Sequence, residues 1–256
     1  MTWQSDGWEV RTRIGVLVPH ADIGPESELN AIAPTGVAIH ATRIPFGAMA
    51  VGGGMDPTIA EDPVRAFAAP PGVDDAAELL AAAPIHAIAF GFTSSAYLIG
   101  PEGEAEMIER LQQRTHGIPV VATCSAAVQA LRALEVQRVA LIDPPWFSAD
   151  LNAAGRKYYE SAGFDVVYSA PCLLPSGQTL IEPQALYSWA IEHVPDTAEA
   201  VVIGGNGFRA IGIIDALEQA LGCPVLTANQ VLLWAALKAV GADAAGVTRY
   251  GRVFSV

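Results

Sequence analysis

The sequence is poor in cysteine, in histidine and in long apolar runs, and each shortage excludes a class of protein. Its three cysteines, Cys124, Cys172 and Cys223, have a spacing that suits neither a disulfide framework nor a zinc cluster. Its five histidines show no HExxH or similar spacing, so we expect no metal. Charge, Pro or Gly interrupts every apolar run before it reaches membrane-spanning length, so we expect no membrane partner.

Basic side chains are also scarce. The chain has 14 Lys and Arg against 27 Asp and Glu, which gives a formal net charge of −13 at pH 7. The basic residues are scattered, which makes nucleic acid a poor candidate partner. The first residues, MTWQSDGWEVRTR, lack the apolar core of a signal peptide, so a cytoplasmic protein is expected.

Hydrophobic residues, in contrast, make up 52% of the 256 residues, enough for one larger α/β domain or two small ones that share a cleft. Eight short apolar runs show little polar alternation, which is typical of parallel strands covered on both faces. Helical patterns lie between the runs, so the sequence predicts a doubly wound α/β fold. The predicted strands are Ile14–Pro19, Val37–Ile44, Ala87–Phe92, Pro119–Thr123, Val139–Ile142, Val166–Ser169, Ala200–Gly204 and Pro224–Thr227.

The chain contains an internal echo. Residues Ile108–Leu134 and Ile214–Val240 both read as helix, Gly, X-Pro-Val strand, small polar turn and helix. This similarity predicts two pseudo-symmetric, Rossmann-like lobes with parallel sheets and a cleft between them, although any two such units share some likeness. We expect residues 1-135 and 230-256 to form the first lobe and residues 136-229 the second. Ligands bind beyond the carboxyl ends of parallel strands, so the turns there should face each other.

The Gly- and Pro-rich stretch Phe46–Pro63 fits a long loop over this cleft, and a lid and a disordered surface loop both remain open. The other predicted helices are Asp74–Ala83, Glu104–Thr115, Ala126–Leu134, Ser148–Ala162, Pro183–His193, Ile211–Leu221 and Gln230–Val240.

Several polar side chains at predicted strand ends are candidates for chemistry. His20 suits a general acid or base near neutral pH, or a capping role. Asp22 and Glu26 either contact a substrate or cap the first helix. His40 lies inside a predicted strand, where a satisfied core or interface histidine is expected.

Cys124 is the candidate nucleophile, because it lies where a strand enters a helix and a helix N-terminus lowers a thiol pKa. The alternative is a small buried residue that fills the turn. Cys172 and Cys223 are expected to be structural. The hydroxyl run Thr93–Ser95 lacks the G-x-S-x-G pattern of an α/β-hydrolase.

Taken together, the motifs resemble one known family. The chain is similar to the maleate isomerase and arylmalonate decarboxylase branch of the aspartate/glutamate racemase superfamily. The resemblance covers nearly the whole chain and implies two α/β lobes, no cofactor, and proton transfer or bond-making at the carbon next to a carboxylate, with one Cys from each lobe. The matching stretches are RIGVLVPHADIGPESELNAIAPTGVAIHATRI, AIAFGFTSS, GIPVVATCSAAVQALRAL, RVALIDP, GCPVLTANQVLLWAALKAVG and RYGRVF.

The sequence departs from that family at both thiol positions. Phe92 replaces the first Cys in a C-T-S turn, and Gly205 replaces the second in the run Gly204–Asn206. Cys124 lies in the following turn, where relatives carry small or hydroxyl residues, so it does not restore the pattern.

Other family positions are kept or changed. Thr93, Ser94, Thr227 and Asn229 match the family's anion donors, and backbone N–H groups near Asn206 complete the predicted oxyanion site. Asp22 stands where relatives have an amide, and an ionised carboxylate repels a substrate carboxylate. Trp146 or Phe147 stands where relatives place a Tyr. These changes favour a larger, aromatic or partly cationic substrate.

The sequence therefore predicts a cofactor-independent isomerase or lyase, with hydrolase chemistry possible, that acts on a small carboxyl or carbonyl compound without a catalytic thiol. His20 or Asp22 would transfer the proton, and Thr93 and Ser94 would stabilise the oxyanion. The alternatives are an inactive relative that only binds a small molecule, and a protein in which Cys124 acts after all. A homo-oligomer is left open.

Overall fold

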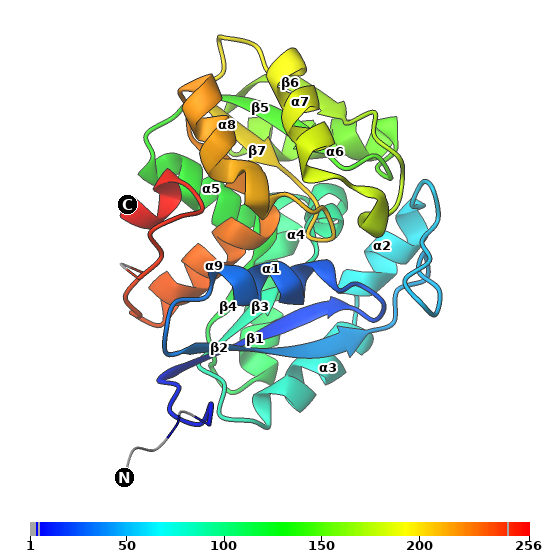
Figure 1. Cartoon of the computed structure of the whole chain (residues 1–256). Coiled ribbons are helices and arrows are strands. Elements are labelled where there is room, and N and C mark those ends of the chain that lie inside the picture. The colour runs from blue at the N-terminus through cyan, green and yellow to red at the C-terminus, as the bar shows by residue number, and fades with distance from the viewer. Residues whose placement is uncertain (1–3, 5, 245) are drawn as a thin grey trace.

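The computed structural model describes residues 4, 6–244 and 246–256, and its strands form two sheets of four (Figure 1). The first sheet has the order β2-β1-β3-β4 and the second the order β6-β5-β7-β8, with parallel pairing throughout. The two orders are the same pattern displaced by four strands, which is what a duplicated α/β unit produces. The strands are β1 (Thr12–Pro19), β2 (Val37–Ile44), β3 (Ala87–Phe90), β4 (Val120–Ala122), β5 (Arg138–Asp143), β6 (Asp165–Pro171), β7 (Ala200–Ile203) and β8 (Val225–Thr227).

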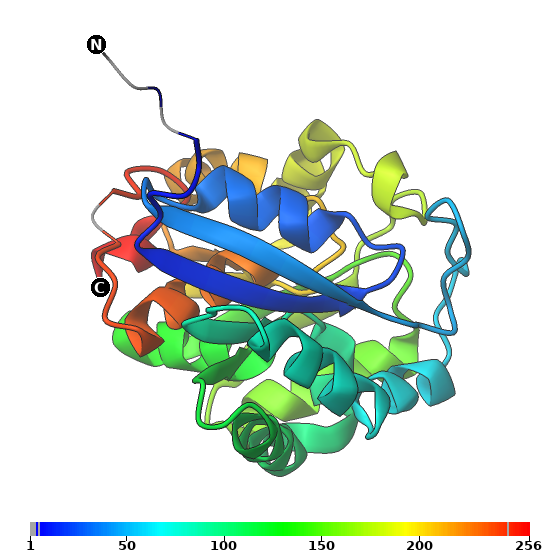
Figure 2. The ribbon, with the colours of Figure 1, turned by 90° about the horizontal axis from the view of Figure 1, so that it is seen from below.

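Helices cover the sheets, and the predicted α/β fold is confirmed. In the first lobe α1 and α9 lie on one side of the sheet and α3 and α4 on the other, as Figure 2 shows for α1 and α3 around β1 and β2. No helix in the described residues is long and apolar enough to cross a membrane. The helices are α1 (Gly24–Ile32), α2 (Glu61–Ala68), α3 (Gly72–Ala81), α4 (Thr93–Arg114), α5 (Thr123–Ala133), α6 (Ala149–Ser161), α7 (Pro183–His193), α8 (Ile214–Leu221) and α9 (Ala228–Ala239), with 3-10 turns η1 (Gln178–Leu180), η2 (Ile211–Ile213) and η3 (Arg252–Ser255).

Two helices differ from the sequence prediction. The helix predicted to begin at Glu104 begins at Thr93 instead, and it is interrupted at Gly100, whose φ is 72°. The Gly100–Pro101 pair kinks the helix here rather than starting it, since Pro is tolerated in the first turn after a break. Helix α2 begins at Glu61, inside the stretch predicted to be a loop up to Pro63.

The edge strands are less covered than predicted. Most residues of β2 are partly exposed, and His40 is exposed, because β2 has a neighbour on one side only. His40 is therefore not a core histidine, and of the two expected roles the interface histidine stays a prediction. Strand β3 has strands on both sides and helices on both faces, and all four of its residues are buried.

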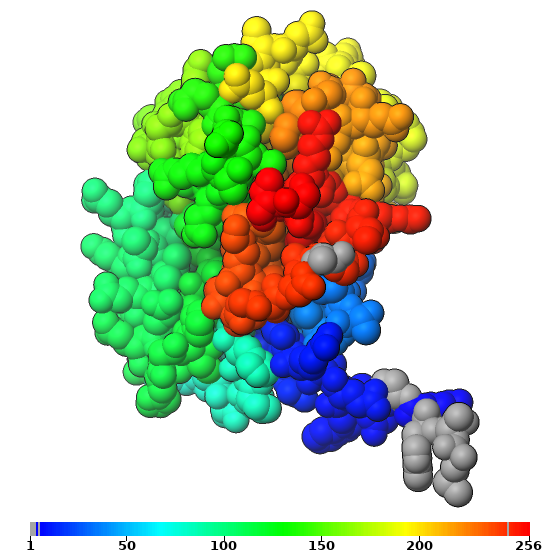
Figure 3. All heavy atoms as spheres, turned by 90° about the vertical axis from the view of Figure 1, so that its left-hand side faces the viewer, coloured from blue at the N-terminus to red at the C-terminus, as the bar shows by residue number. Residues whose placement is uncertain are grey.

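The lobes share helices at their boundary. Helix α4 packs on α6, α5 packs on α9, and α9 contacts β3 and β4 of the first sheet. The C-terminal segment, red in Figure 3, lies against α8 and α9, where Trp234 Nε1 donates to Val256 O at 3.3 Å. The contact of α9 with the first sheet is our reason for keeping residues 230-256 with the first lobe, and this division stays a prediction.

Candidate active site

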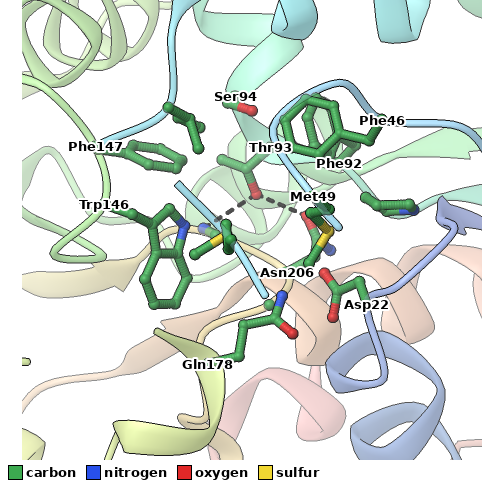
Figure 4. A pocket seen from close by; sticks show the side chains of 15 residues that line it. Asp22, Phe46, Met49, Phe92, Thr93, Ser94, Trp146, Phe147, Gln178 and Asn206 are labelled. Carbon is green, nitrogen blue, oxygen red and sulfur yellow. Dashed lines mark hydrogen bonds between the residues drawn. The ribbon is translucent and has the colours of Figure 1, made fainter. Parts of the chain in front are cut away.

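One cavity of about 30 Å³ lies between the lobes, beyond the carboxyl ends of strands from both sheets (Figure 4). Turns after β1, β3, β5 and β7 all contribute to its lining, which is the arrangement expected for facing turns in a duplicated fold. A cavity of this volume holds one or two water molecules. It is lined by Pro19, Asp22, Phe46, Met49, Met55, Ile59, Phe92, Thr93, Ser94, Trp146, Phe147, Gln178, Gly205, Asn206 and Gly207.

Phe92 belongs to an aromatic wall on the first-lobe side of this cavity. Its ring centroid lies 4.1 Å from that of Phe67 and 5.0 Å from that of Phe46. Trp146 and Phe147 line the cavity from the second lobe. The bulky Phe92 side chain therefore forms part of an apolar surface. It occupies the position where the family resemblance places a thiol.

The predicted loop Phe46–Pro63 covers the cavity and contributes Phe46, Met49, Met55 and Ile59 to its lining. The backbone N–H of Ile59 donates to the carbonyl of Trp146 at 3.0 Å. The loop therefore contacts the second lobe, and its apolar side chains cover the cavity.

Thr93 and Asn206 connect the two lobes at the cavity. The Thr93 hydroxyl donates to Asn206 Oδ1 at 2.8 Å and accepts from the backbone N–H of Gly205 at 3.1 Å. Thr123 lies within 3.2 Å of the same amide oxygen. Thr93 begins α4, so its hydroxyl is fixed by a helix start on one side and by a glycine turn on the other.

The buried carboxylate of Glu28 is linked to Asn206 through the side chain of Asn229. Asn206 Nδ2 donates to Asn229 Oδ1 at 2.9 Å, and Asn229 Nδ2 donates to Glu28 Oε2 at 2.8 Å. Glu28 also accepts from the backbone N–H of Ala210 at 2.8 Å. Asn229 does not line the cavity, so it orients Asn206 rather than contacting a ligand. Glu28 was missed, although its position beside Leu29 on the apolar side of a helix could have identified a buried acid.

Backbone donors face the same space. Asn206 and Gly207 line the cavity, and their N–H groups donate to no acceptor among the described residues. The N–H groups in the first turn of α4, at Thr93 and Ser94, have no partner within the helix. These donors come from both lobes, and together with the Ser94 hydroxyl they can hold a carboxylate or an oxyanion. The Thr93 hydroxyl, predicted to be an oxyanion donor, instead gives its hydrogen to Asn206 Oδ1.

Two glycines allow the turn after β7 to pack closely against the turn after β5. Gly205 has a φ of +83°, and a Cβ there would lie 2.8 Å from Pro144 Cγ. A Cβ at Gly204 would lie 2.5 Å from Asp143 Oδ1. Both positions of the second-lobe turn therefore require glycine, and a cysteine side chain does not fit at Gly205 with this backbone.

Asp22 is the ionisable group in the described cavity lining. Burial raises the pKa of Asp22 to about 6, against the lowering effects of the Gly24 N–H, the Gln178 side chain and the charge of Arg43. Its Oδ1 accepts from the Gly24 N–H at 2.8 Å. A carboxyl group with this pKa exchanges protons near neutral pH, as a general acid or base must.

Other predicted residues lie elsewhere. His20 does not line the cavity, and its Nδ1 accepts from the backbone N–H of Phe46 at 3.1 Å, which holds the start of the covering loop. Thr227 is buried at the N-terminus of α9, and Glu26 pairs with Arg43 outside the cavity.

Cys124 is fully buried and does not line the cavity. Burial raises the pKa of the Cys124 thiol well above its ordinary value, and the charges of Glu104 and Asp143 add to the effect. The expectation that the helix N-terminus lowers this pKa is therefore wrong, because desolvation outweighs the helix dipole. No cysteine is found in the cavity lining among the described residues.

Gln178 was missed by the sequence analysis. It lies in the 3-10 turn η1, and Figure 4 shows its amide facing the Asp22 carboxylate below Asn206. No local motif marks it, because η1 is a short turn far from the strand ends. The described residues contain no group of three or more His, Cys, Asp or Glu side chains arranged to hold a metal ion.

Comparison with known proteins gives one family. The arylmalonate decarboxylase family model matches residues 34–254. Arylmalonate decarboxylase of Bordetella bronchiseptica is 25% identical over 171 residues, which cover 63% of this chain and 68% of that protein.

Solved structures show the same fold. A Nocardia farcinica maleate cis-trans isomerase mutant with a covalently bound succinylcysteine intermediate has a TM-score of 0.83 at 22% identity, covering 95% of this chain and 98% of that one. A mutant arylmalonate decarboxylase in its liganded form has a TM-score of 0.78 at 22% identity, with the same coverage of 95% and 98%. At these identities the structural matches establish the architecture, including the two parallel sheets.

Proposed function

Because this chain belongs to the arylmalonate decarboxylase family, we propose that it is an isomerase or lyase that acts without a cofactor and without a catalytic thiol. Its relatives are named as decarboxylases and isomerases. The substrate is a small compound with a carboxyl or carbonyl group. One observation carries this proposal: Asp22, with a pKa of about 6, shares a largely apolar cavity with hydroxyl and N–H donors from both lobes.

The donors stabilise negative charge on the substrate oxygen. The Ser94 hydroxyl and the N–H groups of Asn206 and Gly207 belong to residues that line the space where a carboxylate or enolate oxygen fits. The Thr93 hydroxyl donates to Asn206 Oδ1 and accepts from the Gly205 N–H, so it holds the turn that carries the Asn206 and Gly207 N–H groups in place before charge develops. Preorganised donors of this kind contribute about 3 kcal/mol each to a transition state.

Asp22 moves the proton. In proton exchange or isomerisation, its carboxylate removes a proton from the carbon next to the carbonyl, and the electron pair moves to the enolate oxygen. In decarboxylation of a compound with a carbonyl group next to the reacting carbon, the bond to the leaving carboxylate breaks, carbon dioxide departs, and protonated Asp22 donates its proton to that carbon of the resulting enolate. A pKa of about 6 makes both protonation states available near neutral pH.

The cavity favours an apolar substituent on the reacting carbon. Phe46, Phe92, Trp146 and Phe147 line it, and no Lys, Arg or His is part of its described lining. A second carboxylate next to the reacting carbon would lie beside Asp22 without a cation to balance it. We therefore expect aryl- or alkyl-substituted monocarboxylates and carbonyl compounds to be better substrates than maleate or an arylmalonate.

Solvent exchange tests this function directly. The protein is incubated in deuterium oxide with a panel of substituted acetates and ketones, and deuterium uptake next to the carbonyl is followed by proton NMR. Uptake that disappears in Asp22→Asn supports the proposal. Activity on maleate or an arylmalonate, at rates above those of the panel, contradicts the proposed substrate class.

A relative that only binds its ligand is the second candidate, and the lack of a thiol in the described cavity lining is the observation that favours it. The same panel separates the two. A compound that binds to the wild type, gives no exchange or turnover, and loses affinity in Thr93→Ala supports binding alone. Turnover that is lost in Asp22→Asn while binding persists supports the enzyme.

A further inference from the structure

A second, larger cavity adjoins the candidate active site. This groove has a volume of about 460 Å³ and lies between α1, the turn η1 and the segment around Arg209. It shares Gln178 and Gly207 with the active-site cavity. The active-site cavity holds one or two water molecules, so most of any organic substrate has to occupy a neighbouring space.

The wall between the two cavities is thin. A Cβ at Gly207 would lie 2.2 Å from Gln178 Nε2 and 2.9 Å from Asp22 Oδ2, so the Gln178 side chain packs directly on the glycine backbone. Figure 4 shows Gln178 and Asp22 on the side of the cavity below Asn206. Rotation of the single Gln178 side chain away from Gly207 would join the groove to the cavity.

The groove combines apolar surface with one cation. Ile23, which is 59% exposed, and Ile211 contribute apolar side chains. Arg209 is exposed, and no hydrogen bond or ion pair connects its guanidinium with any other described residue. In a chain with 27 acidic and 14 basic residues, an arginine left without a carboxylate beside a cavity is available for a ligand.

The acid in the groove lining, Glu28, forms no ion pair with this arginine. Glu28 accepts from the Asn229 side chain and from the N–H groups of Ala210 and Ile211, so its carboxylate oxygens are already used. The other polar side chains of the groove, Ser27 and Thr179, are uncharged at neutral pH. Arg209 is therefore the cationic side chain in the described lining of the groove.

We propose that this groove binds the part of the substrate remote from the reacting carbon, and that Arg209 pairs with a carboxylate at the far end of that part. This inference rests on the proposed function. The substrate then carries one carbonyl or carboxyl group at the Thr93 and Asn206 donors, an apolar stem along Ile23 and Ile211, and a second, distant carboxylate at Arg209.

Calorimetric titration of straight-chain monocarboxylates and α,ω-dicarboxylates of matched and increasing length tests the proposal. At a chain length that spans both sites, the dicarboxylate should bind the wild type about tenfold more tightly than the monocarboxylate, since charge-assisted bidentate pairs are strong. Arg209→Gln should remove this advantage and leave monocarboxylate binding unchanged. The control Lys157→Gln removes the same charge from an exposed site on α6 and should keep the advantage.

The outcomes separate the groove from the active site. An advantage that persists in Arg209→Gln, one that disappears equally in Lys157→Gln, or a wild type that binds no dicarboxylate overturns the groove proposal. Thr93→Ala should weaken monocarboxylate binding. If it binds both ligands as the wild type does, the proposed donors are wrong, while the Arg209→Gln result still decides the groove.

Discussion

The Thr93 hydroxyl lies 2.8 Å from Asn206 Oδ1, and this contact joins two turns that are 113 positions apart in the chain. One turn follows β3 and the other follows β7, the equivalent strand of the second half. The two halves of the duplicated fold therefore meet through a hydrogen bond at the cavity. We expect catalysis and inter-lobe stability to depend on this same pair.

Thr93→Ala tests the pair. It removes the donor to Asn206 and the acceptor for the Gly205 N–H, so we expect deuterium exchange to slow by about 10²–10³-fold and the free energy of unfolding to fall by about 1–2 kcal/mol. Thr93→Ser keeps the hydroxyl and should keep most of both. Exchange NMR and urea denaturation measure the two effects, and wild-type exchange in a folded Thr93→Ala protein would contradict the assigned role.

Asp22 sets the expected pH dependence of proton exchange. Burial raises its pKa to about 6, so the carboxylate that acts as base forms as the pH passes upward through that value. The exchange rate should therefore rise across pH 6 and level off above it. Asp22→Asn should abolish the reaction, whereas Asp62→Asn, at an exposed position on α2, should not. An unchanged profile in Asp22→Asn would rule out Asp22 as the base.

Thiol reactivity tests the location of the cysteines. Cys124, Cys172 and Cys223 are 0%, 1% and 9% exposed. We expect the native protein to react slowly with Ellman's reagent, and the unfolded protein to react at every cysteine. A fast-reacting thiol in the native wild type would show that one of the three is accessible.

Gly205 tests the claim that the second-lobe turn excludes a side chain. Gly205→Ala puts a Cβ at a φ of +83° and close to Pro144, and should cost about 1–3 kcal/mol in the free energy of unfolding. The control Gly212→Ala places its Cβ in open space and should be nearly neutral. Equal stability of the two variants would show that the turn adapts to a side chain, and would reopen position 205 to a cysteine.

Asp143 makes stability depend on pH. Burial raises its pKa from an ordinary value of 3.8 to about 7, although the Asn152 amide and the Tyr97 hydroxyl lower it. The folded state then holds this proton more tightly than the unfolded state, so its contribution is complete below about pH 4 and is lost as the pH rises through 7.

We therefore expect the free energy of unfolding to fall between pH 4 and 7, by up to about 1.4 kcal/mol per pH unit for this one group. Asp143→Asn should flatten the curve in part, because Glu104, also buried, has a pKa of about 7 as well. Urea denaturation across this range measures the slope. A variant with the wild-type slope would place the titration elsewhere.

The sequence predicts the fold well because its strands are buried. Ala87–Phe90 is covered on all sides, and such runs are apolar without alternation. The echo between the halves predicted two similar lobes, and the two sheets have matching strand orders. The first turns of α4 were missed, because the Gly100–Pro101 pair is typical of a helix boundary and here only kinks the helix. Helix α2 was missed as well.

The site was predicted only in part. Asp22, Thr93 and Asn206 follow strand ends, and the topology brings strand ends together. Gln178 comes from a short turn whose place depends on tertiary packing, so no local pattern marks it. Cys124 was a candidate nucleophile because it lies at a helix start, but it is completely buried outside the cavity. Its burial depends on tertiary packing, which the sequence does not display.

Asp22, and no thiol, is proposed to transfer the proton in this cavity. The most direct measurement compares deuterium exchange by a cysteine-free variant, with Cys124, Cys172 and Cys223 changed to Ala, with exchange by Asp22→Asn. We expect the cysteine-free protein to exchange at close to the wild-type rate and Asp22→Asn not to exchange. A folded cysteine-free protein without activity, together with an active Asp22→Asn variant, would contradict it.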